Sequence, residues 1–242
     1  MGRTAGGLPR LTSRLTTMPF FRSPRRLATF VYRKQLRVFE VLNKNVLFNQ
    51  VLNSTFRSSK AFEDRFDLYE HLNRCILQNA PIDYLEFGVW QGATIKKWCD
   101  LNRSGDSRFY GFDSFRGLPE NWNETHSEGC FDVGGRPPII DDSRVAFVTG
   151  LFQETLVGFL KNFRNNHRLV VHIDCDLYSS ALYCLATLHP YLVPGSIVVF
   201  DEFRVLEDEF SAFCDYTRAF YRKWEGLAHT AIYSSVAMLV KE

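Results

Sequence analysis

The stretch "YLEFGVWQGATIKKW", residues 84–98, opens with the apolar run of a buried strand, breaks at a glycine and continues with helical apolar spacing. Its Glu86, Gly88 and Gly92 form the pattern E-x-G-x-x-x-G. This spacing matches neither G-x-G-x-x-G nor the phosphate loop G-x-x-x-x-G-K-[ST], so a nucleoside triphosphate is disfavoured. The free N–H groups at the start of the helix can instead receive a carboxylate.

Strand and helix patterns alternate after this turn, which predicts an α/β fold with a mostly parallel sheet and helices on both faces. Helices are expected over 62–78, 93–102, 153–163, 180–192 and 207–224. Seven strands are expected, the last two as a C-terminal antiparallel hairpin: 82–87, 108–112, 144–148, 168–173, 195–200, 229–235 and 236–242. Ligands of such folds bind beyond the carboxyl ends of the strands.

Composition separates a basic start from the rest of the 242-residue chain. Residues 1–50 hold ten Lys or Arg and one acid, Glu40. We expect 1–55 to be an extension, partly disordered over the first twenty residues or so and partly an amphipathic helix, and 56–242 to be one domain. The helix can lie on an anionic membrane, meet an acidic partner or pack on the domain's edge.

The six cysteines are scattered without a C-x-x-C pair, which is typical of reduced thiols and a cytoplasmic protein. Cys175 and Cys184 are expected to be packing residues. No apolar run approaches the ~20 residues that span a bilayer, so we expect membrane contact to be peripheral at most. No nucleic-acid partner is expected, and homo-oligomerisation stays open.

Acidic residues end three of the predicted strands. Asp113 can accept hydrogen bonds from both ribose hydroxyls of NAD or S-adenosylmethionine, or it can form an Asx turn. The other acids are Asp174, Asp176, Asp201 and Glu202. Their strands should be neighbours, and two like charges ~4 Å apart repel by about 4 kcal/mol at an effective dielectric of 20, so a cation is expected. Oxygen ligands favour magnesium or calcium, although Asp176 can equally cap a helix.

A hydride-transferring enzyme has no need of this cluster, whereas a methyltransferase acting on a hydroxyl does, because a divalent cation lowers the pKa of an alcohol. The ordered segments that span Phe62 to Phe203 resemble the macrocin O-methyltransferase family (TylF/MycF type). Its members are class I enzymes that use S-adenosylmethionine, many on sugar hydroxyls. The matching segments are "EFGVWQGATIKKW", "YGFDSFRGLPENW", "CFDVGG", "VTGLFQETL", "VHIDCDLYSSAL" and "LVPGSIVVFDEF".

The resemblance implies a Rossmann-like methyltransferase domain and a role for each matched residue. Glu86, Gly88 and Gly92 would shape the methionine side of the cofactor pocket, Asp113 would hold the ribose, and Phe152 and Gln153 would lie near the adenine. Asp174, Asp201 and Glu202 would bind Mg²⁺, and Asp174 would act as base. The family's D-G-D, P-G-G and D-D-Y are here D-C-D, P-G-S and D-E-F, and the glutamate changes the expected geometry of the metal site.

Four histidine and aromatic positions complete the prediction. His172 is expected to be a hydrogen-bonded core residue. The segment 120–142 can form a lid that carries His126, Trp122 and Phe131. We therefore expect a Mg-assisted O-methyltransferase that acts on a small-molecule hydroxyl of a glycoside or other secondary metabolite. The alternatives are a metal-independent methyltransferase and a nucleoside-binding protein without turnover.

Overall fold

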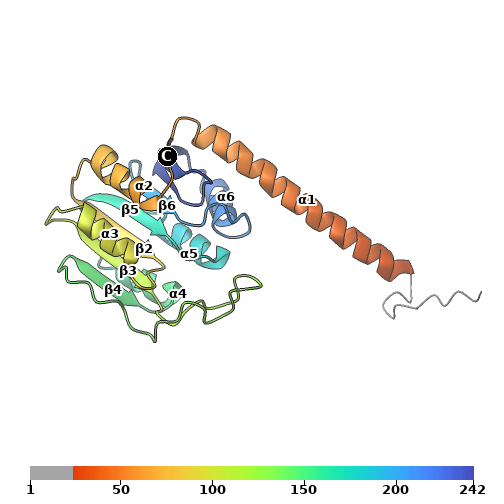
Figure 1. Ribbon diagram of the computed structural model, residues 1–242, viewed down its shortest axis with the longest axis horizontal. Coiled ribbons are helices and arrows are strands. Elements are labelled where there is room, and N and C mark those ends of the chain that lie inside the picture. Colours follow the sequence, from red (N-terminus) through yellow and green to blue (C-terminus); the bar gives the residue numbers. More distant parts are fainter. Residues whose placement is uncertain (1–23) are drawn as a thin grey trace, which may run out of the picture. The chain divides into compact units, whose positions relative to one another are not determined.

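A single sheet of eight strands organises the computed structural model, which describes the backbone of residues 24–242 and the side chains of residues 35–242 (Figure 1). The strand order is β1-β7-β8-β6-β5-β2-β3-β4. Only the pairings of β8 with β6 and with β7 are antiparallel. The bounds are β1 Lys60–Phe62, β2 Ile82–Phe87, β3 Arg108–Asp113, β4 Val145–Thr149, β5 Arg168–Ile173, β6 Ile197–Phe200, β7 Trp224–Thr230 and β8 Val236–Val240.

The sheet confirms the predicted fold and corrects two details. Its eighth strand, β1, is a three-residue edge strand parallel to β7, and three residues are too few to give a periodic signal. The first hairpin strand ends at Thr230, whereas the sequence predicted a strand over 229–235. Residues 231–235 form the turn instead, where Tyr233 has a left-handed φ of 58° and Tyr233 N–H donates to Thr230 O over 2.8 Å.

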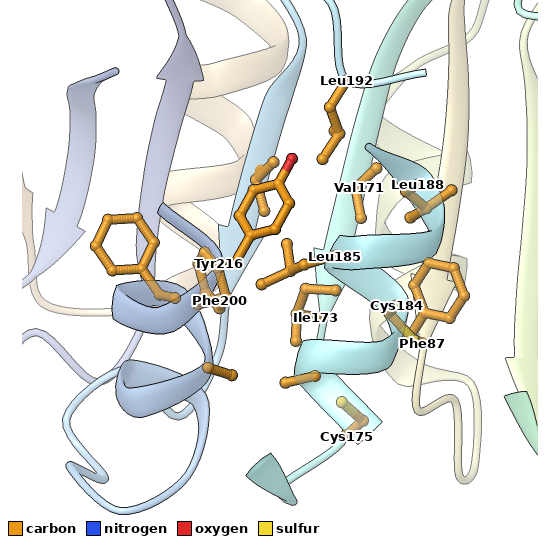
Figure 2. Packing of buried hydrophobic residues seen from close by; sticks show 14 of the residues in the cluster. Phe87, Val171, Ile173, Cys175, Cys184, Leu185, Leu188, Leu192, Phe200 and Tyr216 are labelled. Carbon is orange, nitrogen blue, oxygen red and sulfur yellow. The ribbon is translucent and has the colours of Figure 1, made fainter. Parts of the chain in front are cut away.

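Alternate residues of the central strands enter two separate cores, which is why these strands read as continuous apolar runs. On one face, Tyr84 packs with residues of α2 (Arg65–His71) and α3 (Ala93–Leu101). On the other, Phe87 packs with α4 (Phe152–Leu160), α5 (Tyr178–Leu188) and α6 (Glu209–Ala219). Figure 2 shows the second core, with Cys175 and Cys184 among its buried side chains. Both cysteines are thus packing residues, as predicted, and none of the six cysteines forms a disulfide.

All five predicted helices end earlier than expected, and the first and the last differ most from their predicted bounds. The helix predicted over 62–78 begins at Arg65, because the carboxylate of the N-cap residue Asp64 accepts the N–H of Phe66 over 2.6 Å. After His71 it continues as a π-helical turn, η1 (Leu72–Ile76). The last helix ends at Ala219, five residues before the predicted end at Trp224, which instead begins β7.

The N-terminal helix α1 runs from Pro24 to Thr55, and the compact unit that contains the sheet begins within it, at Asn45. Phe48 is buried there against Phe203 and Phe210, with ring centroids 6.1 and 5.1 Å apart. The compact unit thus includes the last eleven residues of the predicted extension, and the predicted domain boundary at 55/56 stays a prediction. The disorder predicted for the first twenty residues lies outside the described part of the chain. Within residues 24–242, no helix has both the length and the apolar character to cross a membrane.

Candidate active site

One cavity lies at the carboxyl ends of the parallel strands. It is at the switch point of the sheet, where β2 lies between β3 and β5. Its volume is about 350 Å³, at the lower end of the range for small-molecule sites. The lining includes most of the predicted site residues: Gly88, Asp113, Phe152, Gln153, Asp174, Asp176, Asp201 and Glu202.

Glu86 and Gly92 are not among the lining residues. Glu86 is fully buried beneath the cavity, where its Oε2 accepts the hydroxyl of Tyr84 over 2.5 Å. Gly92 is the N-cap of α3 with a φ of 79°, and a Cβ there would lie 2.7 Å from Cγ of Pro138. Their predicted place at the methionine side of the cofactor pocket stays a prediction.

Gly88 allows two strand ends to approach each other closely. Its φ is 96°, and a Cβ at this position would lie 1.6 Å from the backbone oxygen of Asp174. No other residue type fits this contact, because even an alanine methyl would overlap the carbonyl. The glycine that the sequence assigned to a ligand turn thus also brings the end of β2 against the end of β5.

Asp113 ties the end of β3 to the turn after β2. Its Oδ2 accepts the N–H groups of Val89 and Trp90 over 2.9 and 2.8 Å, and its Oδ1 accepts the N–H of Phe115 over 2.7 Å. The last contact is the Asx turn that the sequence left open. A carboxylate has about four lone-pair sites, so three amides leave it room for about one more donor. Its ribose contact stays a prediction.

Four carboxylates gather on the other side of the cavity. Asp174 and Asp176 follow β5, Asp201 and Glu202 follow β6, and these two strands pair in parallel. Burial and the nearby charge of Asp201 raise the pKa of Asp174 well above its ordinary value. Burial and the charge of Glu202 raise the pKa of Asp176 to about 7. This side therefore holds protons at a pH where ordinary carboxylates are ionised.

Three side chains, two from α2 and one from the turn between β7 and β8, hold the carboxylate of Asp201. Arg65 of α2 donates to Oδ2 through Nη1. Oδ1 accepts the hydroxyls of Tyr69 and Ser235 over 3.3 and 2.7 Å. Neither Arg65 nor Tyr69 was predicted, because the sequence places them in a helix more than 100 residues before the acids they meet.

This donor set does not fit a divalent ion. In residues 35–242, no group of three or more His, Cys, Asp or Glu side chains could hold a metal ion. The Asp201 oxygen that a metal would need is bonded to a guanidinium. The assignment of magnesium to Asp174, Asp201 and Glu202 stays a prediction from the sequence.

Glu209 fixes the loops that carry these acids, a role that was not predicted from the sequence. Its fully buried carboxylate accepts the N–H of Cys175 over 3.3 Å and that of Glu202 over 3.1 Å. One side chain from α6 thereby fixes the backbone after both β5 and β6. Its only sequence signal is an acid in the first turn of a helix, which ordinarily indicates an exposed position.

A buried polar chain runs beneath the cavity. Nδ1 of His172 lies 2.9 Å from the Tyr84 hydroxyl, and Nε2 lies 3.4 Å from the hydroxyl of Tyr69, which donates to Asp201. His172 is fully buried, and burial lowers its pKa to about 4, so the imidazole is neutral near pH 7. His172 is thus the hydrogen-bonded core residue that the sequence predicted.

The segment predicted as a lid contributes only part of its aromatic side chains to the cavity. Phe131 lines the cavity and its ring meets that of Trp90, with centroids 5.8 Å apart. Trp122 instead donates to Asp208 over 2.9 Å, and neither it nor His126 lines the cavity. Glu120 accepts the hydroxyl of Ser179 over 2.6 Å, so contacts with the domain anchor the segment at two places.

Comparisons with known proteins agree with this geometry. Residues 85–203 match the family model described as "Methyltransferase domain". A curated relative from Streptomyces olivaceus, 8-demethyl-8-(2,3-dimethoxy-alpha-L-rhamnosyl)-tetracenomycin-C 4'-O-methyltransferase, is 29% identical over 163 residues. The match covers 58% of this chain and 60% of the relative, so it spans well under two thirds of the relative's length.

Two solved structures share the fold. The calicheamicin methyltransferase CalS11 is 21% identical with a TM-score of 0.59, and the match covers 98% of this chain and 99% of that protein. The O-methyltransferase NovP is 22% identical with a TM-score of 0.56, with 74% and 80% covered. The family match and the strand-end cavity identify residues 85–203 as a class I methyltransferase domain.

Proposed function

We propose that this protein is an S-adenosylmethionine-dependent O-methyltransferase that methylates a sugar hydroxyl of a secondary-metabolite glycoside. The observation that carries the proposal is a cavity at the switch point of a methyltransferase domain with carboxylates along one side. The name of the curated relative, a 4'-O-methyltransferase of a rhamnosyl compound, supports the acceptor class. Negative charge is suited to the sulfonium and ammonium groups of the methyl donor.

Residues on the two sides of the cavity would have different roles. Asp113 would accept a ribose hydroxyl, and Phe152 and Gln153, at the start of α4, would contact the adenine. S-adenosylmethionine, when bound, supplies an electrophilic methyl group on sulfur. An S–C bond breaks as an O–C bond forms, and the acceptor hydroxyl loses its proton. Asp174 would take that proton, because its carboxylate lines the cavity at the end of β5.

Aromatic side chains at the cavity suit the acceptor. Trp90 and Phe131 both line it and remain 47% and 36% exposed. Exposed aromatic rings at a binding site contribute apolar contact area to a sugar or its aglycone. Leu118 and Pro119, which directly precede the segment 120–142, belong to the same lining.

The sequence also predicted that magnesium assists the reaction, whereas the contacts of Asp201 favour the metal-independent alternative. An alcohol without a bound metal must lose its proton to a base in the transition state, which Asp174 can provide. Glu202 would then position the acceptor through its carboxylate. No step of this proposal requires a metal ion.

Titration calorimetry with S-adenosylmethionine, combined with transfer of a labelled methyl group to a panel of rhamnosides and other glycosides, tests the proposal. We expect saturable cofactor binding and transfer to at least one acceptor. Cofactor binding without transfer to any hydroxyl would instead support the non-catalytic nucleoside-binding alternative. Absence of cofactor binding would contradict both functions.

Replacing Asp174 by Asn tests its role as base. General base catalysis contributes roughly 10²–10⁴-fold, so kcat is expected to fall by that factor. Cofactor affinity should change little, because Asn has nearly the same volume. The matched control is Asp141→Asn, which is outside the lining residues and should retain full activity. Unchanged kcat for the Asp174 variant would remove it from the catalytic role.

The basic N-terminal extension is proposed to contact an anionic membrane surface. Its exposed helix residues include Arg37, Leu42 and Val46, and Lys44 is partly exposed, which suits peripheral contact. In a flotation assay, the full chain should float with anionic vesicles at low salt and should not float with them at high salt. A chain beginning at Asn45, which keeps Phe48 in the core, should not float with these vesicles.

A further inference from the structure

Helix α2 places two side chains on one carboxylate. Arg65 and Tyr69 are four residues apart, so both project from the same face of the helix. Arg65 donates to Oδ2 of Asp201, and Tyr69 donates to Oδ1. The N-cap contact of Asp64 fixes where this helix starts, and thereby which residues reach Asp201.

A divalent ion at this place would have to displace these partners. Mg²⁺ requires near-octahedral oxygen coordination at about 2.0–2.1 Å and gives up its water reluctantly. Asp201 is 5% exposed, and its two oxygens together accept three side-chain donors. A metal bound here would also lie close to a guanidinium that cannot lose its charge.

Arg65 itself faces the cavity. Its side chain is 36% exposed and belongs to the lining, together with Asp174, Asp176 and Glu202. The guanidinium offers five N–H donors in a planar arrangement, so it can hold Asp201 and still present donors to the cavity. Positive charge is therefore already present where the carboxylates gather.

We propose that the guanidinium of Arg65 is the resident cation of these strand-end carboxylates, in the place that the sequence pattern assigns to a divalent ion. Arg65 neutralises Asp201 and keeps Mg²⁺ out. For its meaning in catalysis this inference rests on the proposed function, since it makes methyl transfer independent of metal. The contact itself can be tested without turnover.

The experiment is a titration of the full-length, metal-stripped protein with Mn²⁺, followed by electron paramagnetic resonance. We expect no saturable binding by the wild type in the low millimolar range. Arg65→Gln removes the positive charge and should bind Mn²⁺ at least about tenfold more tightly. Arg65→Lys keeps one charge and should stay close to the wild type.

Two further variants make the result specific. Arg74→Gln removes an exposed cation from the adjoining π-helical turn, where Arg74 lies 3.7 Å from Glu70, and should not change Mn²⁺ binding. Adding Asp201→Asn to Arg65→Gln should abolish the gain, because it removes the carboxylate. Tight Mn²⁺ binding by the wild type, displaced by Mg²⁺, would overturn the proposal even if Arg65→Gln failed to fold. Equal affinity of wild type and Arg65→Gln would also overturn it.

Failure of the proposed function gives a different signature. If the protein does not bind S-adenosylmethionine, the Mn²⁺ titrations still report whether Arg65 excludes a metal. If the enzyme is active, EDTA should leave the wild-type rate unchanged, and Arg65→Gln should become sensitive to EDTA. Loss of wild-type activity in EDTA that Mg²⁺ restores would contradict Arg65 as the resident cation while leaving the methyltransferase proposal intact.

Discussion

Asp113 and Asp201 occupy equivalent positions at the ends of β3 and β6, but the protein holds them in different ways. Asp113 accepts three backbone N–H groups, all from residues within 24 positions along the chain. Asp201 accepts side-chain donors from α2 and from the turn between β7 and β8. A local sequence motif can predict a carboxylate that nearby backbone groups hold. The contacts of a carboxylate that distant side chains hold form only in the folded tertiary structure.

Gly88 joins these two sides, and its replacement by Ala should have the largest effect. The new Cβ would lie 1.6 Å from the backbone oxygen of Asp174, at a φ of 96°. Since neither backbone segment can move aside without disturbing a strand end, we expect a loss of more than about 3 kcal/mol in the free energy of unfolding. Urea denaturation measures this. In the control Gly105→Ala, the Cβ would have no atom within 4 Å, and we expect a change near zero.

Substituting Asn for each aspartate sharpens the comparison itself. An Asn side chain presents an NH₂ group where Asp113 meets N–H donors, and backbone donors cannot reverse their role. Around Asp201, the hydroxyls of Tyr69 and Ser235 can rotate to accept a hydrogen bond instead. We therefore expect Asp113→Asn to lose about 2–3 kcal/mol and Asp201→Asn about 1 kcal/mol in the free energy of unfolding. Equal losses would show that backbone and side-chain support are equivalent here.

The same difference explains what could be predicted from the sequence. The βα alternation gave the parallel sheet and its hairpin, because apolar runs and glycine turns are local signals. The site residues Gly88, Asp113 and Asp174 end predicted strands, so the fold rule placed them at one edge of the sheet. Phe152 and Gln153 required the family resemblance, since no chemical pattern marks them.

The remaining parts of the site depend on contacts that no local pattern encodes. Arg65 lies 136 residues before Asp201, and Glu209 reaches back to Cys175 and Glu202 from the following helix. The edge strand β1 escaped prediction because it is three residues long. The compact unit begins within α1, where Phe48 is buried. The sequence did not indicate this, because a buried aromatic residue in a basic helix has the same pattern as one on an exposed amphipathic face.

Glu86 is a third carboxylate for the comparison. Its side-chain hydrogen-bond donor is the phenol of Tyr84 and not a cationic group. Burial raises its pKa from 4.5 to about 8, although the hydrogen bond from Tyr84 opposes this. Between these values the folded protein keeps a proton that the unfolded chain has released, so rising pH favours unfolding. The maximum slope is about 1.4 kcal/mol per pH unit, and the contribution is constant above pH 8.

His172 has the opposite effect in a lower range. Its pKa is lowered from 6.5 to about 4, so its contribution to stability rises with pH across that range and is constant above it. Between pH 6.5 and 8, the titration of Glu86 therefore lowers the free energy of unfolding, and His172 makes no opposing contribution. From pH 6.5 to pH 8, we expect the free energy of unfolding of the wild type to fall by about 1 kcal/mol more than that of Glu86→Gln. Urea denaturation of both proteins at pH 6.5 and at pH 8 measures this difference. Parallel pH dependence of the two proteins would mean that Glu86 is already ionised when folded, and that a carboxylate beneath this cavity needs no cation such as Arg65.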